Sequence, residues 1–423
     1  MSGGRSATLR FVEKGALCSG CGLCAAVAEP GAVEMRLQAA GYLRPQVLRD
    51  LSPQEDALVA STCPGLRLRQ ENTEGEDHAI WGPVLKTRIG HATDPALRFH
   101  ASSGGVLSAT LIYLLESNAV DYVVQTAESP ESPVHNAIAE SFERSSVYHA
   151  AGSRYGPSAP LSDVRRQLQQ PGRFAFVGKP CDVAALRALG RHDPRVAAKI
   201  PFIVSFFCAG VPSLKGTKEI LAKLGVSDDE VAGFRYRGDG WPGATSVKTR
   251  DGRTLQMSYA EAWGGILSRH LQFRCKICPD GSGGFADMVC ADAWYGDDNG
   301  YPAFAESEGR SLVITRTRKG EDLVLQAQNA GYITLSDVDI DEVARMQPFQ
   351  ARRKMLIVSR LAALALLARP RPRYEGLRLM RAARMAGLRD TATSFLGMLK
   401  RLLMPMSEKP PVRRRRPRHA DLS

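Results

Sequence analysis

Eight of the nine cysteines in this chain form two groups of four, a pattern typical of thiolates that bind metal. In the first group, Cys18, Cys21 and Cys24 follow one another at intervals of three residues. This spacing wraps a short loop, so the three thiolates converge on one face of a 4Fe-4S cluster. Gly20 and Gly22 lie between them and let the backbone approach the cluster and donate N–H hydrogen bonds to its sulfides.

The fourth ligand of this cluster is predicted to be Cys63. It precedes Pro64, as the fourth cysteine of bacterial-type ferredoxin motifs does. An insertion of 38 residues separates it from Cys24, so we expect only one ferredoxin-type cluster in this region. Four thiolates also suit zinc, but zinc sites usually use two CxxC pairs. We therefore favour a cluster over zinc or free thiols.

The second group of cysteines comes from three separate segments. Cys181 follows one predicted strand, and Cys208 ends the next. Because the carboxyl ends of parallel strands face one crevice, both thiols are expected to meet there. Cys275 and Cys278 supply two more thiolates and complete a second 4Fe-4S site. The alternative is a thioredoxin-like CxxC redox pair, with the first two cysteines buried in the core.

Two glycine-rich loops are candidates for binding a flavin or a nucleotide. Residues 100–105 (HASSGG) precede an apolar helix, whose N-terminus favours phosphate, although an ordinary helix cap explains the loop as well. Residues 236–243 (YRGDGWPG) combine a cation, an aromatic ring and a permissive backbone, and a tight surface turn is the alternative. Neither loop matches the dinucleotide-binding GxGxxG motif or the Walker motif.

The elements that must position these residues alternate between strands and helices. This alternation indicates an α/β fold with a largely parallel sheet. Residues 346–403 are expected to be helical, and the basic, proline-rich end after Pro405 to be disordered. Apolar runs predict strands at 119–125, 174–178, 201–207 and 311–317, and helical periodicity predicts helices at 106–115 and 183–189.

The net charge of +12 belongs to the end of the chain. From Arg352 onward there are 19 basic and 4 acidic residues, whereas the remainder carries 37 basic and 40 acidic ones. A nucleic-acid-binding core is therefore not expected. No apolar segment of a secretory signal begins the sequence, and the run Leu361–Ala368 is far shorter than the roughly 20 residues of a spanning helix. We therefore expect a soluble, cytoplasmic protein whose cysteines are thiolates rather than disulfides.

Six motifs, in order, resemble the beta-subunit family of coenzyme F-420 hydrogenases and dehydrogenases. Relatives in that family include 7-hydroxymethyl chlorophyll a reductase and a divinyl reductase. The chain departs from the family pattern at Ala291, where many relatives have glycine, and at Cys290, which is either an inert buried residue or an alternative ligand. The motifs are CSGCGLC at 18–24, SSGGVLSATLIYLLE at 102–116, VGKPCDVAALRAL at 177–189, FFCAGVPS at 206–213, YRGDGWPG at 236–243 and CKICPDGSGGFADMVCADAW at 275–294.

The resemblance implies two 4Fe-4S clusters and one FAD, with electrons passing between them and a second redox partner. It also implies that both glycine-rich loops contribute to a flavin site. No histidine–carboxylate pair stands out as a proton donor, so no catalytic residue is assigned. The residues expected at the flavin are Ser102, Ser103, Gly104, Gly105, Arg237, Gly238, Trp241 and, less directly, Lys179.

We therefore expect four parts: a ferredoxin-like iron–sulfur region at 1–80, an α/β domain for FAD and the second cluster at 81–345, a helical extension at 346–403, and a disordered basic tail at 404–423. The expected function is electron transfer between a ferredoxin-like partner, the clusters, FAD and an organic or deazaflavin substrate. One alternative is a non-catalytic electron-transfer subunit of a larger complex. Another is a zinc-stabilised binding protein.

The segment Leu377–Leu403 has apolar residues at helical spacing with arginines between them. It is expected either to touch an anionic membrane surface weakly or to pack on the body as an ordinary amphipathic helix.

Overall fold

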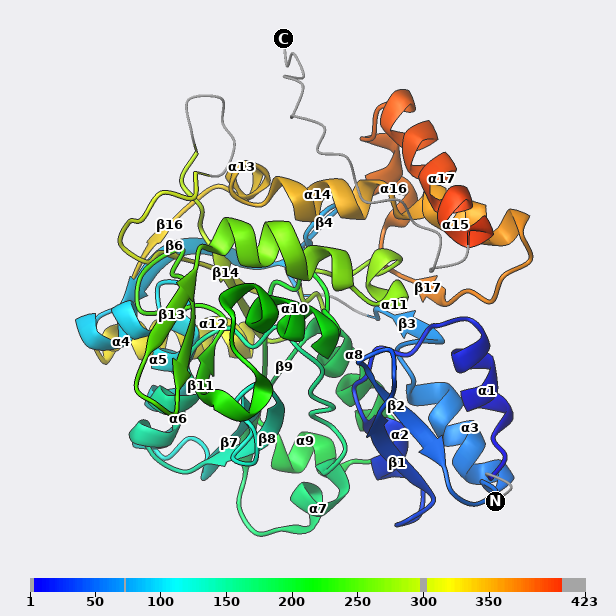
Figure 1. The fold of residues 1–423 in the computed structure, drawn as a ribbon, viewed down its shortest axis with the longest axis horizontal. Coiled ribbons are helices and arrows are strands. Elements are labelled where there is room, and N and C mark those ends of the chain that lie inside the picture. Colours follow the sequence, from blue (N-terminus) through cyan, green and yellow to red (C-terminus); the bar gives the residue numbers. More distant parts are fainter. Residues whose placement is uncertain (1–3, 72–73, 297–302, 405–423) are drawn as a thin grey trace.

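The computed structural model describes residues 4–71, 74–296 and 303–404 (Figure 1). Its centre is an eight-stranded mixed sheet with the strand order β16-β6-β15-β14-β10-β9-β7-β8. The strands, in sequence order, are β6 (Lys86–Ala92), β7 (Tyr122–Glu128), β8 (Asn136–Ser141), β9 (Phe174–Gly178), β10 (Phe202–Phe206), β14 (Met288–Asp292), β15 (Ser311–Thr315) and β16 (Ile333–Asp337).

The prediction of a largely parallel sheet is wrong, because only part of the sheet is parallel. Only the central strands β7, β9, β10 and β14 run parallel, and the pairings β7–β8, β14–β15, β15–β6 and β6–β16 are antiparallel. The physical reason lies in the connections, because parallel neighbours need a long crossover. The helix α8 (Pro180–Gly190) provides one between β9 and β10, whereas β8 follows β7 after a short loop and must return antiparallel.

The individual elements predicted around the sheet are confirmed within a few residues. The strand predicted at 174–178 is β9, and those predicted at 201–207 and 119–125 are β10 and β7. Helix α5 (Val106–Glu116) and α8 occupy the predicted helical runs. These segments were readable because apolar strands and helices bury their side chains on both faces of the sheet.

Helices cover the two faces of the sheet with different cores. Helices α5 and α12 (Arg318–Asn329) pack on one face, where Val106 and Leu323 meet Val177. Helix α8 packs on the other face, where Val183 meets Phe176 and Leu23 of the N-terminal region. The N-terminal region therefore shares a core with the second face.

The N-terminal region places its insertion in a hairpin and a helix. Strands β1 (Val33–Leu37) and β2 (Leu43–Val47) pair antiparallel, and α3 (Pro53–Thr62) leads back to Cys63. Ser52 and Glu55 form a capping box that begins α3. The other helices here are α1 (Ala7–Lys14) and α2 (Leu23–Val27).

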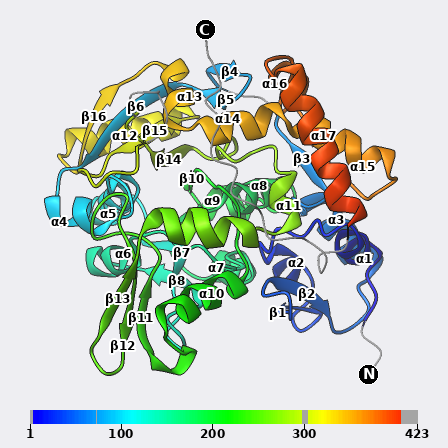
Figure 2. The same ribbon diagram turned by 45° about the horizontal axis from the view of Figure 1, so that its top comes forward.

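The C-terminal residues fold back onto the N-terminal region. Strand β17 (Arg373–Glu375) pairs parallel with β3 (Arg67–Arg69). Leu364 and Met398 pack with Val12 and Leu17 in one core, and Figure 2 shows the end of the last helix close to α1. The helices of this segment are α14 (Pro348–Met355), α15 (Ile357–Leu366), α16 (Leu379–Arg384) and α17 (Leu388–Leu403).

The remaining elements surround this frame. A three-stranded sheet follows α10 (Leu214–Leu224) and consists of β11 (Val231–Arg235), β12 (Thr245–Thr249) and β13 (Thr254–Met257). Smaller elements are β4 (Glu76–His78), β5 (Gly82–Val84), α4 (Pro95–His100), α6 (Arg144–Ala150), α7 (Val164–Gln169), α9 (Arg195–Lys199), α11 (Phe273–Lys276) and α13 (Val343–Met346), together with the short turns 228–230, 260–266, 267–270 and 340–342.

The segment expected to touch a membrane packs on the body through one face of α17. Met398 is buried there, while Leu388 is 90% exposed on the other face. No helix in the described ranges combines the length and apolarity needed to cross a membrane. The predicted tail lies, from residue 405 onward, outside the described residues.

Candidate functional site

The first cysteine set lies where α1, α2 and α3 meet. Cys18 and Cys21 precede α2, Cys24 lies within it, and Cys63 caps the end of α3. Burial raises the pKa of all four thiols. Neighbouring thiols of the set raise the pKa of Cys21, Cys24 and Cys63 further, and the pKa of Cys63 reaches about 11. The four predicted ligands are therefore brought together in one place, where Cys21 is buried and the other three are partly buried.

The loop between these cysteines requires its two glycines. Gly20 and Gly22 have φ angles of 77° and 87°, which side chains rarely tolerate. A Cβ on Gly22 would lie 2.9 Å from the carbonyl oxygen of Ala159. Gly20 also donates its N–H to the sulfur of Cys18 at 3.4 Å. The loop is thus shaped to turn backbone N–H groups toward sulfur.

The second set forms at the carboxyl ends of two parallel strands. Cys181 begins α8 after β9, and Cys208 follows β10, whose Ser205 is in register with Gly178. Burial and then the carboxylate of Asp182 raise the pKa of Cys181, and Cys208 raises it further. Burial and then Cys275 raise the pKa of Cys208 to about 12.

The other two thiols of this set lie on and just after α11. The sulfur of Cys275 accepts the Val211 N–H at 3.3 Å and the side-chain amide of Gln272 at 3.4 Å. Cys278 is close enough to raise the pKa of both Cys181 and Cys208. The structure thus gathers all four cysteines that the sequence placed in the second group.

Two residues that sequence reasoning did not select connect the two sets. The Gln272 amide donates to the Ser19 carbonyl at 3.1 Å as well as to Cys275, so it touches both loops. Arg274 is 2% exposed and donates to the Pro64 carbonyl at 2.8 Å. Its charge lowers the pKa of Cys18 and Cys63, and its own pKa is raised, against the effect of burial, by Tyr374 and by thiols of the second set. Their closeness in sequence to Cys275 was the only feature by which the sequence could have indicated this role.

Both thiol sets fit cluster ligation in their chemistry. Buried thiols with raised pKa values stay protonated at neutral pH unless a bound cation stabilises the thiolates. Within the described residues, no three His, Cys, Asp or Glu side chains lie at the spacing that holds a single metal ion. The ligand roles stay predictions.

Cys290 lies on β14 and belongs to the core between the sheet and α5. Burial alone raises its pKa, whereas thiols of the same set contribute for Cys181 and Cys208. Its main-chain carbonyl accepts the Phe207 N–H at 2.9 Å, and its side chain reaches the cavity described next. This placement accords with an inert buried residue.

A cavity of about 270 Å³ opens beside the second set. Cys208 lines it, and so do Gly178 and the residues that follow Cys208. Its volume lies just below the lower end of the roughly 300–1,000 Å³ range typical of ligand and cofactor pockets. Of the predicted flavin residues, those that line the cavity are Ser102, Ser103, Gly105, Lys179 and Arg237.

The Ser-Ser-Gly-Gly loop forms one wall of this cavity. Gly105 caps α5 with a φ of 77°, and a Cβ on Gly104 would lie 2.6 Å from the Ser311 nitrogen. The fold itself therefore demands both glycines. Ser102 accepts a hydrogen bond from Ser153 at 2.8 Å, and its position leaves it in reach of a ligand.

The second loop is anchored by a buried ion pair. Arg237 donates two hydrogen bonds of 2.8 Å to Asp292, and the Trp241 indole N–H donates to the same carboxylate at 2.8 Å. Burial disfavours the charge of Arg237, but Asp292 more than offsets this and raises its pKa. Trp241 also stacks on Trp294 at 4.7 Å. The described lining of the cavity leaves out Gly104, Gly238 and Trp241.

Lys179 is a buried cation at the edge of the cavity. Its ammonium group lies 2.7 Å from Asp182 and 3.1 Å from the Ser158 hydroxyl. Although burial opposes its charge, Asp182 and then Cys181 raise its pKa. The cavity also holds aromatic residues that sequence reasoning missed, among them Tyr259 and Trp263. They lie in a segment without a distinctive motif.

Comparison with known families matches most of this region. Residues 88–165 match the model that describes the N-terminal part of the beta subunit of coenzyme F420 hydrogenase/dehydrogenase. Residues 172–341 match the model that describes the C-terminal part of the same beta subunit. The matched residues hold the second cysteine set and the cavity lining apart from Gln347 and Gln350, whereas the first set lies before them.

Curated relatives agree with this result. The coenzyme F420 hydrogenase subunit beta of Methanococcus voltae is 27% identical over 60% of this chain and 85% of its own length. The coenzyme F420 hydrogenase subunit beta of Methanothermobacter thermautotrophicus is 24% identical over 69% of this chain and 99% of its own length. The coenzyme F420-dependent sulfite reductase of Methanocaldococcus jannaschii is 25% identical over 59% of this chain, which spans only 38% of that relative.

The fold resembles a chain of the F420-reducing [NiFe] hydrogenase complex from Methanosarcina barkeri. The TM-score is 0.54 at 19% identity, and the match covers 69% of this chain and 96% of that one. At this identity the likeness concerns the fold alone.

Proposed function

Because the chain belongs to the coenzyme F420 hydrogenase/dehydrogenase beta-subunit family, we propose that it is an iron–sulfur flavoprotein oxidoreductase. It passes electrons, in either direction, between a ferredoxin-like partner and an organic or deazaflavin substrate. Its relatives are subunits or enzymes of F420-linked oxidoreductases, which supports a redox role.

One observation carries this proposal: the two cysteine sets and the cavity form a continuous series. Gln272 touches the loops of both sets, and Cys208 of the second set lines the cavity. Clusters bound at the two sets would carry single electrons, and FAD would exchange paired electrons or hydride with a substrate. The order of sites therefore suits conversion between one-electron and two-electron chemistry.

The chain's own residues would hold and insulate these groups. The first set would ligate one 4Fe-4S cluster through Cys18, Cys21, Cys24 and Cys63. The second would ligate another through Cys181, Cys208, Cys275 and Cys278. Lys179 and Arg237 line the cavity as buried cations and would contact a flavin there, although Asp182 and Asp292 already balance their charges. Ser102 and Ser103 offer hydroxyls there, while Gly104, Gly238 and Trp241 shape the wall.

A second candidate is a non-catalytic electron-transfer subunit of a larger redox complex. The relatives from Methanococcus voltae and Methanothermobacter thermautotrophicus are named as subunits, which favours it. In this case the clusters and flavin would be present, but the isolated chain would reduce no substrate.

The proposal is tested by purifying the protein without oxygen and measuring iron, acid-labile sulfide, zinc, flavin and the absorption spectrum. We expect about eight irons and one FAD per chain, with a broad visible absorption that bleaches on reduction. A colourless, zinc-containing protein without flavin would overturn the proposal and leave a structural or binding role. Turnover of F420 or of organic acceptors by the isolated chain then separates the two candidates.

A further inference from the structure

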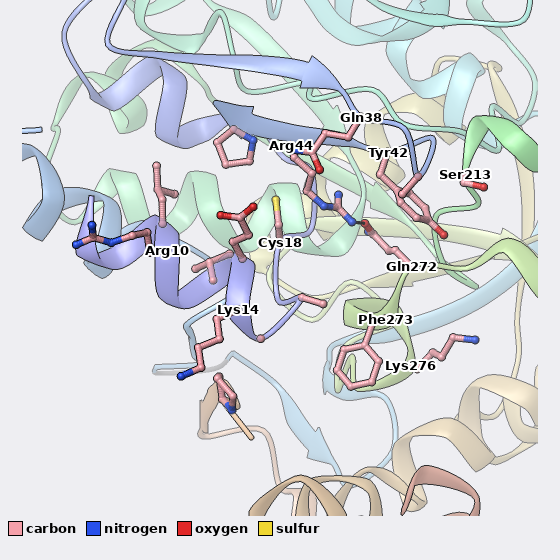
Figure 3. A pocket seen from close by; sticks show the side chains of 18 of the residues that line it. Arg10, Lys14, Cys18, Gln38, Tyr42, Arg44, Ser213, Gln272, Phe273 and Lys276 are labelled. Carbon is pink, nitrogen blue, oxygen red and sulfur yellow. Dashed lines mark hydrogen bonds between the residues drawn. The ribbon is translucent and has the colours of Figure 1, made fainter. Parts of the chain in front are cut away.

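A groove beside the first cysteine set forms a second cavity, separate from the one assigned to flavin. Its volume is about 1380 Å³. It lies between α1, the β1–β2 hairpin, α11 and the ends of α15 and α17 (Figure 3). We call it the basic groove, because nine basic residues and a single carboxylate, Glu13, line it. The basic residues are Arg10, Lys14, Arg36, Arg44, Lys215, Arg269, Lys276, Arg369 and Arg401.

Most of this positive charge is not neutralised by the chain itself. Arg36 pairs with Glu34 and Arg269 with Glu219. Within the described residues, no carboxylate lies at ion-pair distance from six of the others. Like charges gathered around one concave surface focus an electric field that attracts an anionic partner. The six are Arg10, Lys14, Arg44, Lys215, Arg369 and Arg401.

The floor of the basic groove reaches the first cysteine set. Cys18 lines the groove and is partly exposed, whereas Cys21 behind it is 8% exposed. Arg44 lies beside Cys18 in Figure 3 and donates to the Gln272 side-chain oxygen at 3.0 Å. Gln272 in turn donates to Cys275 of the second set. Charge and access to the redox centres therefore coincide at this surface.

We propose that the basic groove is the docking surface for a small acidic one-electron carrier protein. This inference rests on the proposed function and locates its protein partner. Complementary charge speeds the encounter of such partners, and electron-transfer interfaces are small enough for one groove to form their centre. Each encounter moves one electron and no atoms. Two reduced carriers are therefore oxidised for each substrate that accepts two electrons.

The test reverses charge in the groove without touching the cysteine loops. The variant Arg10→Glu/Lys215→Glu/Arg369→Glu changes three exposed side chains, which lie on α1, on α10 and in the loop after α15. Glutamate is tolerated at position 215, in the first turn of α10, because the helix N-terminus favours negative charge.

A matched control makes the same change in net charge elsewhere. The variant Arg191→Glu/Lys248→Glu/Arg389→Glu alters three exposed residues that do not line the groove. Arg389 lies at the far end of α17, roughly 18 Å from Arg401 by helical rise, which exceeds the screening length of about 8 Å at physiological salt.

Two measurements use a purified acidic bacterial ferredoxin as the probe. The first is the dissociation constant of oxidised ferredoxin for the full-length chain, which does not depend on cofactor content. The second is the second-order rate of reduction by reduced ferredoxin in an anaerobic stopped-flow instrument. We expect the groove variant to lose at least about tenfold in both, with a shallower salt dependence, and the control to stay within about threefold of the wild type.

Several outcomes would overturn the groove assignment. Equal loss in both variants would show a general charge effect, and no loss in either would place docking elsewhere. If the groove variant weakened binding to phosphatidylserine vesicles but not to ferredoxin, the groove would be a membrane contact. A wild type without iron and flavin would refute the proposed function. Ferredoxin binding would still show whether the basic groove is a docking surface.

Discussion

At the scale of single residues, the cysteines divide into three environments. The first set and the second set each gather four thiols, and Cys290 packs in the core of the sheet. Gln272 and Arg274 join the two sets through hydrogen bonds to Ser19 and Pro64. The two sets are thus adjacent but do not share a ligand, so each can be lost separately.

The first residue-scale prediction concerns Cys21→Ser. We expect this variant to lose about half of its iron and sulfide while it keeps FAD, because one ligand set is broken and the cavity lies beside the other. Iron, sulfide and flavin per chain measure the effect, and Cys290→Ala is the matched control, expected to retain all three. Proportional loss of flavin and all iron would contradict two separate sites.

The second residue-scale prediction concerns Arg237→Ala. This change leaves the partly buried Asp292 (side chain 18% exposed) without its cation, so we expect the free energy of unfolding to fall by about 1–3 kcal/mol and FAD retention to weaken. Denaturant unfolding and flavin content measure the two effects. If the variant does not fold, Arg237→Lys keeps the charge but loses the paired hydrogen bonds and is expected to bind FAD less tightly. Full flavin occupancy in a folded variant would rule out a role at the cofactor.

At the scale of elements, ion pairs and hydrogen bonds tie covering helices to the central sheet. Helix α12 is one example, because Glu321 accepts a hydrogen bond of 2.9 Å from Arg88 on β6 and one of 2.7 Å from Thr315 on β15. Arg88 also pairs with Asp337 on β16. These contacts fasten the antiparallel half of the sheet to the helix that covers it.

The ion pair between α12 and β6 predicts a pH dependence. Hydrogen bonds from Arg88 lower the pKa of Glu321, so its contribution to stability is present above the ordinary glutamate pKa of about 4.3 and is lost as pH falls through the lower folded value. We expect Glu321→Gln to lower the free energy of unfolding by about 1–3 kcal/mol at pH 7. Urea unfolding at pH 7, 5 and 4 should show the difference from the wild type shrinking only below about pH 4.3.

The control for this pair is Glu342→Gln, which removes an exposed pair with Arg345. Exposed pairs contribute only about 0–1 kcal/mol, so a small effect is expected there. An equal effect of the two substitutions would show that the Arg88–Glu321 pair contributes no more to the free energy of unfolding than an exposed pair.

At the scale of the whole molecule, the C-terminal helices close over the second cysteine set. Arg353 on α14 donates to the Cys208 carbonyl at 2.9 Å, and Arg360 on α15 donates to the Lys276 carbonyl at 2.8 Å. The Tyr374 hydroxyl donates to the Ile277 carbonyl at 2.7 Å. The segment thus supports the backbone that carries three of the four predicted ligands.

This support predicts that a residue far from the motifs controls iron retention. We expect Arg353→Ala to release the iron of the second set several times faster on exposure to a chelator, because the Cys208 and Ala209 carbonyls lose their donor. The adjacent Arg352→Ala is the control, since Arg352 is exposed and pairs only with Asp390. Identical release rates in both variants would mean that the C-terminal helices do not stabilise this site.

The sequence by itself determined the cysteine groups, the family and the elements around them. Three cysteines at intervals of three residues can be read directly, and the apolar runs of β9, β10, α5 and α8 bury side chains in patterns set by local geometry. Register between β9 and β10 then brings Cys181 and Cys208 together, as the parallel order predicted. These features depend on neighbours in sequence or on one strand pairing.

Only the tertiary structure decided the antiparallel half of the sheet, the bridge through Gln272 and Arg274, and the basic groove. Each depends on contacts between segments far apart in the chain, for example Gln272 with Ser19 and β17 with β3. A basic residue in a sequence does not reveal which other charges will share its surface. Packing of α1 and the C-terminal helices against one core, with the β1–β2 hairpin packed on another, gathers them around one groove.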